Sequence, residues 1–183
     1  FAIDPHDGTI KVNKQLDREL FDQVKLRLQV EDLAAQTPDQ VAHSHLLIRI
    51  TDINDNRPTF KRPIYKAVVN ENSISGTSVI TVTGDDRDLN KTLKYSLEAS
   101  SPELARLVRI NPRSGEVTVN DKIDRELFPL INVTIKAEDF GQPHPLTGQT
   151  QLIITVRDEN DNNPIFLNAT HLRPIQARAD HAG

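Results

Sequence analysis

The residues best suited to chemistry form an acidic heptapeptide that occurs twice in this chain of 183 residues. Residues 52–58 read Asp-Ile-Asn-Asp-Asn-Arg-Pro, and residues 158–164 read Asp-Glu-Asn-Asp-Asn-Asn-Pro. Most of these side chains offer carboxylate or amide oxygens, and Ca²⁺ binds about 6–8 such oxygens at irregular angles. The final proline stops both strand and helix, so each copy is predicted to be a short, stiff connector that can hold a divalent cation.

The elements that must position these oxygens are β-strands. An alternating apolar run precedes each heptapeptide: Leu46, Ile48 and Ile50 before the first, and Leu152, Ile154 and Val156 before the second. In the complete module we predict seven short strands with turns between them. Their ranges are about 64–71, 77–83, 92–97, 106–110, 116–119, 131–138 and 149–157. This pattern predicts an all-β fold, a seven-stranded Greek-key immunoglobulin-like β-sandwich without its usual disulfide, since the chain has no cysteine.

The repeat extends far beyond the heptapeptide. Leu-Asp-Arg-Glu-Leu-Phe at 16–21 matches Ile-Asp-Arg-Glu-Leu-Phe at 123–128, with an offset of 107 residues. A period of this length predicts tandem whole domains rather than a solenoid. We therefore predict three parts: residues 1–57 as the later half of a module, 58–163 as a complete module, and 164–183 as the start of a further module or a tail. Half a sandwich would expose apolar side chains, so we expect the chain to belong to a longer protein.

Composition narrows the classes of function. No apolar run approaches the length of a membrane span, so any anchor is expected outside this segment. Three Asn-x-Ser/Thr sequons, at Asn90, Asn132 and Asn168, favour a secreted context. Asn132 is predicted to face outward from its strand. The isoelectric point of about 5.9 and the absence of a basic patch with aromatics argue against nucleic-acid binding.

Four motifs in fixed order resemble tandem extracellular cadherin repeats. They are Asp-Arg-Glu at 17–19, Asp-x-Asn-Asp-Asn-x-Pro at 52–58, Asp-Arg-Asp at 86–88 and Ala-x-Asp-x-Gly at 137–141. The resemblance covers residues 1–166. It implies Ca²⁺ ions, three per complete linker, held by ligands from one module, the linker and the next module.

Carried over residue by residue, the resemblance assigns two sets of metal ligands. The upstream set is Asp17, Glu19, Asp52, Ile53 (carbonyl), Asn54, Asp55, Asn56 (carbonyl), Asp86, Asp88, Asn90 (carbonyl) and Asp139. The downstream set is Glu71, Asp124, Glu126, Asp158, Glu159, Asn160, Asp161 and Asn162.

One departure from the family pattern concerns a glutamate on the first strand of the upstream module. That residue would precede Phe1, and its equivalent in the complete module is Glu71. We therefore expect weaker binding at the upstream junction than in a longer chain. At the downstream junction the next module's Asp-x-Asp pair is missing, so only the ion farthest from that module is expected to be well held.

The charge distribution explains why a cation would matter. Seven of the expected upstream ligands are carboxylates, and setting them aside from the net charge of −4 leaves the rest of the chain at +3. Without metal, these groups are expected to repel one another and leave a flexible hinge. With three divalent ions the repulsion becomes bridging, and calcium sets rigidity rather than performing a reaction.

Other functions fit less well. Paired carboxylates can act as a glycosidase acid and base, but these acids lie in a short linker rather than a substrate cleft. His43 and His45 alternate on one strand and lack an evident third metal ligand. No Gly-x-Ser-x-Gly motif, phosphate loop or cysteine nucleophile occurs, so no enzyme activity and no small-molecule substrate are expected.

By resemblance, the chain is expected to be a calcium-binding spacer in the extracellular portion of a plasma-membrane adhesion glycoprotein. Its partners would be other cadherin-type ectodomains, homophilic or heterophilic. The alternative is a secreted or microbial cadherin-like module that binds matrix or polysaccharide. Flanking sequence with a membrane span would favour adhesion, whereas carbohydrate binding that persists in a chelator would favour the alternative.

Overall fold

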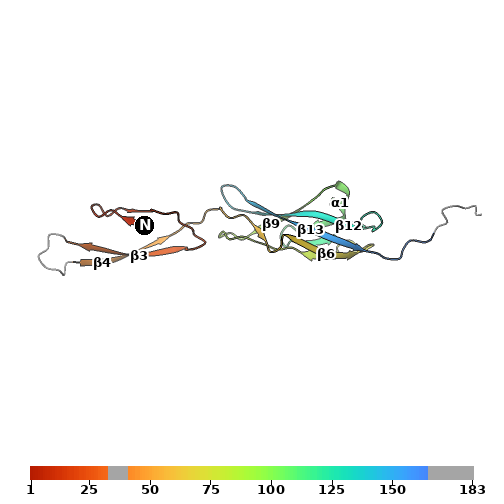
Figure 1. The fold of residues 1–183 in the computed structure, drawn as a ribbon, viewed down its shortest axis with the longest axis horizontal. Coiled ribbons are helices and arrows are strands. Elements are labelled where there is room, and N and C mark those ends of the chain that lie inside the picture. The colour runs from red at the N-terminus through yellow and green to blue at the C-terminus, as the bar shows by residue number, and fades with distance from the viewer. Residues whose placement is uncertain (33–40, 165–183) are drawn as a thin grey trace, which may run out of the picture.

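The structure is a computed structural model that describes residues 1–32 and 41–164. Figure 1 shows two β-rich parts that lie end to end along the long axis of the molecule. The connector between them contains the first acidic heptapeptide, residues 52–58. The predicted start of a further module and the sequon at Asn168 lie outside the described residues.

The first part consists of two antiparallel strand pairs. Strand β1 (Ala2–Ile3) pairs with β2 (Ile10–Lys11), and β3 (Gln23–Glu31) pairs with β4 (Val41–Arg49). Along β3, half-buried apolar residues alternate with exposed polar ones as far as Leu28, as expected for a sheet with one apolar face.

No described residue between 1 and 57 is buried. Leu20 and Phe21 are 69% and 64% exposed, and the apolar residues of β3 and β4 are at best half-buried. Two strand pairs cannot by themselves enclose a core. The assignment of this part to the later half of a sandwich stays a prediction.

The second part is a sandwich of two sheets. The four-stranded sheet has the order β6 (Ile64–Asn70), β13 (Thr147–Arg157), β12 (Leu130–Asp139) and β9 (Leu93–Ala99). The three-stranded sheet has the order β10 (Val108–Ile110), β11 (Glu116–Val119) and β7 (Ser78–Thr81). A short pair, β5 (Thr59–Phe60) with β8 (Gly84–Asp85), lies at the end nearest the connector. All pairings are antiparallel except that of β6 with β13.

The core between the two sheets is almost entirely aliphatic. On β12, Ile131, Val133, Ile135 and Ala137 are at most 2% exposed, and on β13 Leu152 and Ile154 are fully buried. The intervening residues of β12 face solvent or are half-buried, which gives the period of two expected of a strand that is covered on one face. As predicted, Asn132 lies on the exposed side of β12.

All seven predicted strands are present as β6, β7, β9, β10, β11, β12 and β13. The prediction was wrong at residues 106–107, which belong to the short helix α1 (Pro102–Leu107). Ser101 caps this helix by accepting a hydrogen bond from the Leu104 N–H, and Pro102 occupies its first turn. The strand β10 therefore starts only at Val108.

The fold gathers loops from different elements at each end of the sandwich. At the upstream end, the β8–β9 loop and the β12–β13 loop meet the connector, as shown by hydrogen bonds from Leu89 and Asn54 across it. At the downstream end, the β6–β7 and β11–β12 loops meet residues 158–161. Both predicted acidic sites lie at these ends.

Candidate metal sites

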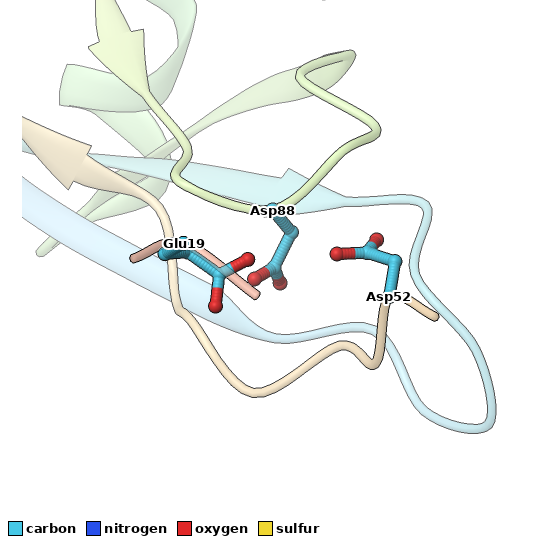
Figure 2. A group of neighbouring side chains, drawn as sticks. All are labelled: Glu19, Asp52 and Asp88. Carbon is cyan, nitrogen blue, oxygen red and sulfur yellow. The ribbon is translucent and has the colours of Figure 1, made fainter. Parts of the chain in front are cut away.

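Three carboxylates from three separate segments converge at the upstream end of the sandwich. Glu19 belongs to the first part, Asp52 to the connector and Asp88 to the β8–β9 loop, and one oxygen of each lies within 4.8 Å of the others. Figure 2 shows the three side chains directed toward a common space. Asp88 lies 36 positions after Asp52 and 69 positions after Glu19 in the sequence. The three residues nevertheless form one acidic cluster, which a single cation is able to bridge.

A cavity of about 1060 Å³ is lined by two members of this cluster, Glu19 and Asp88. Its lining includes carboxylates from both sides of the connector, namely Asp17, Glu19, Asp55, Asp85, Asp86 and Asp88. Glu19, Asp55 and Asp88 therefore border one space.

The second part contacts the connector through hydrogen bonds that involve side chains. Leu89 N–H donates to Asp52 Oδ2 at 3.1 Å, and Asn56 Nδ2 donates to Asp88 Oδ1 at 2.7 Å. Asn54 Nδ2 donates to His144 O at 2.9 Å and lies 3.3 Å from Asp139 Oδ1. These contacts position the connector acids against the loops of the sandwich.

The surroundings of Gly141 explain why the motif at 137–141 ends in glycine. A Cβ atom at this position would lie 1.9 Å from the side chain of Asn54. The glycine therefore leaves the space that Asn54 needs to reach Asp139 and His144. The same Asp139 carboxylate accepts hydrogen bonds from the Gly141 and Leu146 N–H groups, which fixes the β12–β13 loop around it.

Asp86 gives the strongest structural indication of a cation. It is 1% exposed, and its Oδ2 atom is buried without a hydrogen-bond partner. Burial raises the pKa of its carboxyl, and the nearby Asp88 and Asp139 carboxylates raise this pKa further, against the lowering effect of the Asp88 N–H. A buried acid with a free oxygen is unfavourable unless a positive charge compensates it.

Arg18 brings one positive charge to the cluster of Glu19, Asp52 and Asp88. Its Nε atom lies 2.6 Å from Asp52 Oδ1 and 3.1 Å from Glu19 Oε1. The contact with Asp52 is a close ion pair. Burial acts to lower the pKa of Arg18, but Asp52 and Glu19 raise it overall, so the guanidinium stays charged. Arg18 thus pairs with two of the three clustered carboxylates but supplies only one positive charge, so the cluster stays negative overall.

A second cluster lies at the downstream end. Oxygens of Glu71, Asp124 and Glu126 lie within 4.8 Å of one another. Glu71 is 1% exposed and accepts hydrogen bonds from the N–H groups of Arg125 at 2.9 Å and Glu159 at 2.7 Å. It therefore links the β6–β7 turn to the second heptapeptide. Asp161 is tied to the same turn because Asn72 Nδ2 donates to its Oδ2 at 2.7 Å.

The two sites share local geometry as well as sequence. Asn56 Nδ2 donates to Asp55 Oδ1 at 2.8 Å, and Asn162 Nδ2 donates to Asp161 Oδ1 at 2.9 Å. Arg125 repeats the position of Arg18: its Nε donates to Asp158 Oδ1 at 2.8 Å, and this hydrogen bond raises its pKa.

Several predicted ligands do not belong to the two three-carboxylate clusters. The Asn90 side chain accepts a hydrogen bond from the Thr92 N–H in an exposed turn, and Asn160 is exposed. The Ile53 and Glu159 carbonyls accept hydrogen bonds from Asp55 and Asp161 within their own heptapeptides. The sequence motifs did not predict the contacts that Arg18, Arg125, Asn72 and Gly141 make at the two sites. The duplicated Asp-Arg-Glu motif was the available signal for the two arginines.

The donor set fits calcium better than other common metals. The clusters supply only oxygen atoms, since the described residues around them contain carboxylates, amides and backbone carbonyls and no cysteine or clustered histidine. Oxygen-only donors in an open, irregular arrangement suit Ca²⁺, whereas Zn²⁺ favours nitrogen and sulfur ligands.

Known proteins resemble this chain in sequence. The Cadherin domain model matches residues 65–157. Protein dachsous of Drosophila melanogaster is 38% identical over 91% of this chain and 5% of its own length, and human Protocadherin-7 is 36% identical over 84% of this chain and 14% of its own length. The chain thus spans a small part of these relatives.

Solved structures agree with this family. The EC22-24 fragment of mouse Cadherin-23 superposes with a TM-score of 0.76 and 36% identity, covering 87% of this chain and 50% of that fragment. The EC21-23 fragment of human CDH23 gives a TM-score of 0.78 and 31% identity over 92% of this chain and 58% of that fragment. With its motifs, its sandwich and these likenesses all in agreement, the chain belongs to the cadherin family, whose repeats are non-enzymatic segments of adhesion proteins.

Proposed function

We propose that this chain is a calcium-binding spacer in the extracellular portion of a cell-surface adhesion protein, and that calcium makes the connector between its two parts rigid. The observation that carries the proposal is the convergence of Glu19, Asp52 and Asp88 from three segments within 4.8 Å. Residues 1–57 would be the later half of one module, 58–163 a complete module, and 164–183 the start of a further module or a tail. The partners would be other cadherin-type ectodomains.

The cluster needs a counter-charge to hold the two parts together. Two carboxylates about 4 Å apart repel by roughly 4 kcal/mol at an effective dielectric near 20. Glu19 comes from one side of the connector and Asp88 from the other, so this repulsion acts to separate the parts. Bound Ca²⁺ would supply the positive charge that turns the same pair into a bridge.

Each residue of the site would have a defined task. Asp52 and Asp55 present oxygens from the connector, and Asp86 and Asp88 present them from the β8–β9 loop. Asn56 would keep its hydrogen bond to Asp88 and so hold connector and loop in register. Arg18 would have to release Asp52 and Glu19 as these become ligands, because it occupies their oxygens in this structure.

The downstream cluster would bind calcium by the same chemistry. Glu71, Asp124 and Glu126 come from one module, and Asp158, Asn160 and Asp161 come from the second heptapeptide. All six are supplied by residues 58–163, so we expect one ion to be held there without any contribution from a following module.

Within the described residues, no helix is long and apolar enough to cross a membrane. The proposed place at the cell surface therefore rests on the relatives, which are cadherins and protocadherins.

Calcium titration of matched variants tests the proposal. Asp88→Asn should weaken binding at the upstream site by about tenfold or more, because a charged oxygen donor is lost. Glu98→Gln removes the same charge from an exposed position on β9, where Glu98 forms an ion pair with Lys136, and should leave calcium binding unchanged. Calorimetry with the whole chain measures both. Equal affinities for the two variants would refute the assignment.

A further inference from the structure

The β9 end of the sandwich carries a second, differently charged pocket. It has a volume of about 730 Å³ and is lined by Gly84, Lys91, Thr92, Leu93, Lys94, Tyr95, Pro112, Arg113 and Phe140. Three of these nine residues are cationic and none is acidic. A cleft lined by one sign of charge concentrates the field and attracts the opposite charge.

Lys94 and Arg113 line only this pocket, whereas Lys91 lies between it and the acidic cavity and lines both. Among residues 1–32 and 41–164, the side chains of Lys91, Lys94 and Arg113 have neither an ion pair nor a hydrogen-bond partner. Glu138 lies opposite Lys94 in the β12–β9 register, yet the two side chains form no ion pair. All three cations are exposed.

Two aromatic residues, Tyr95 and Phe140, line the pocket, and Tyr95 is held in place by its contacts. Tyr95 is 7% exposed, its hydroxyl accepts a hydrogen bond from the Gly84 N–H at 2.9 Å, and its ring packs against Phe60 at a centroid distance of 6.4 Å. Phe140 is 51% exposed on the β12–β13 loop. One aromatic surface therefore stays accessible, although the residue next to it, Asp139, is buried.

We propose that this pocket binds an anionic saccharide. The volume falls within the range of about 300–1,000 Å³ that is typical of small-ligand sites. Lys91, Lys94 and Arg113 would pair with sulfate or carboxylate groups, for which the planar Arg guanidinium is well shaped. The exposed ring of Phe140 would pack against the apolar face of a sugar ring, which a purely electrostatic site would not offer.

A saccharide fits this surface better than an acidic peptide. A peptide bound to the edge strand β9 would take up backbone hydrogen bonds along its whole length. The pocket touches β9 only at Leu93–Tyr95, and its remaining lining comes from three loops and from Gly84. The ligand surface is therefore compact and charged, not extended.

Calorimetry on the whole chain in calcium buffer tests the inference with four probes. These are a heparin tetrasaccharide, an unsulfated heparosan tetrasaccharide that carries only carboxylates, neutral maltotetraose and a hexaglutamate peptide. We expect one or both anionic saccharides to bind, and the comparison between them tells sulfate from carboxylate recognition. Binding of maltotetraose with equal affinity, binding of the peptide alone, or no binding of either anionic saccharide would overturn the proposal.

Matched variants separate the pocket from diffuse charge. Lys94→Ala combined with Arg113→Ala should weaken saccharide binding by about tenfold or more. Arg62→Ala combined with Lys66→Ala removes the same two charge types from exposed positions outside the pocket and should change affinity by about twofold or less. Equal losses in the two pairs would refute a defined site.

The ring of Phe140 and the integrity of the fold need their own variant and controls. Phe140→Ala leaves the charge unchanged and should weaken binding several-fold, whereas an unchanged affinity would contradict the packing of a sugar on this ring. Thermal unfolding and calcium titration of every variant should match the parent chain. These controls also distinguish failure of this inference from failure of the calcium proposal, because Lys94 and Arg113 do not line the acidic cavity.

Discussion

Asp86 lies in the loop after β8 with 1% of its surface exposed and with Oδ2 unpartnered. Its Oδ1 accepts the Asp88 N–H at 2.9 Å and so shapes the loop that presents Asp88 to the connector. Burial raises the pKa of the Asp86 carboxyl, and the nearby charges of Asp88 and Asp139 raise it further. The structure therefore disfavours the charged form of Asp86. Without a cation, this residue opposes folding and at the same time prepares a binding site.

Asp86→Asn should therefore have effects of opposite sign on stability and on calcium binding. The amide keeps an oxygen for the Asp88 N–H and removes the buried charge, so in chelator we expect the free energy of unfolding to rise by about 1 kcal/mol. In calcium the same change should weaken binding. Denaturant unfolding with and without chelator measures both effects.

The control for this change is Asp121→Asn, at an exposed position where the side chain accepts the Lys122 N–H. It should alter neither quantity by more than a few tenths of a kcal/mol. A loss of stability for Asp86→Asn in chelator would contradict the account of Asp86 as an uncompensated buried charge.

At this scale the recurring motifs pointed to acids that the structure brings together, three at each end of the sandwich. Their role as metal ligands stays a prediction. The motifs did not predict how Arg18 and Arg125 pair with the clusters. A motif identifies donors for a cation, but the competition between a cation and a neighbouring guanidinium depends on side-chain geometry that no spacing encodes. The role of Gly141 was hidden for the same reason, since only its approach to Asn54 reveals it.

At the scale of elements, the two parts contain the same turn in different surroundings. Gly8 and Gly115 have φ values of +75° and +69°, and each N–H donates to a residue four positions earlier, Asp4 or Asn111. A Cβ at Gly115 would lie 2.1 Å from the Val82 carbonyl oxygen, whereas a Cβ at Gly8 would meet nothing within 4 Å. The turn is therefore tightly packed in the sandwich and open in the first part.

This pair gives a matched test of packing. Gly8→Ala carries only the strain of a positive φ, about 1 kcal/mol. Gly115→Ala adds a backbone clash with β-sandwich residue Val82 and should cost at least about 2 kcal/mol more. Thermal unfolding of the two variants compares them directly. Equal costs would show that Val82 moves aside freely and that the turn is not packed as described.

The sequence showed whether a segment is a strand where apolar and polar residues alternate over many positions. It did not show this in short segments. The period of two in β12 and β13 identified both strands within two residues of their ends. The helix α1 spans six residues, too few to show a helical period, and its Ser-Pro start resembles a turn. The two-residue strands β5 and β8 gave no signal because pairing, not pattern, defines them.

At the scale of the whole molecule, the two parts meet through acids rather than through a core. The described residues of the first part contain no buried side chain, while the sandwich encloses a continuous aliphatic core. Figure 1 shows the connector as the narrow region between them. The relative orientation of the parts therefore depends on the hydrogen bonds of Asn54 and Asn56 and on the charge balance of the cavity.

Calcium should accordingly make the whole chain longer and stiffer in solution. We expect small-angle scattering to show a larger maximum dimension and a narrower range of conformations with calcium than with chelator, because bridging replaces repulsion between Glu19 and Asp88. The double variant Asp52→Asn/Asp88→Asn should lose this response, and Glu98→Gln should retain it. Calcium should also protect the peptide bonds of residues 52–58 from proteolysis only where the response is retained. Identical scattering with and without calcium, or a full response in the double variant, would show that the acids at this junction do not control its rigidity.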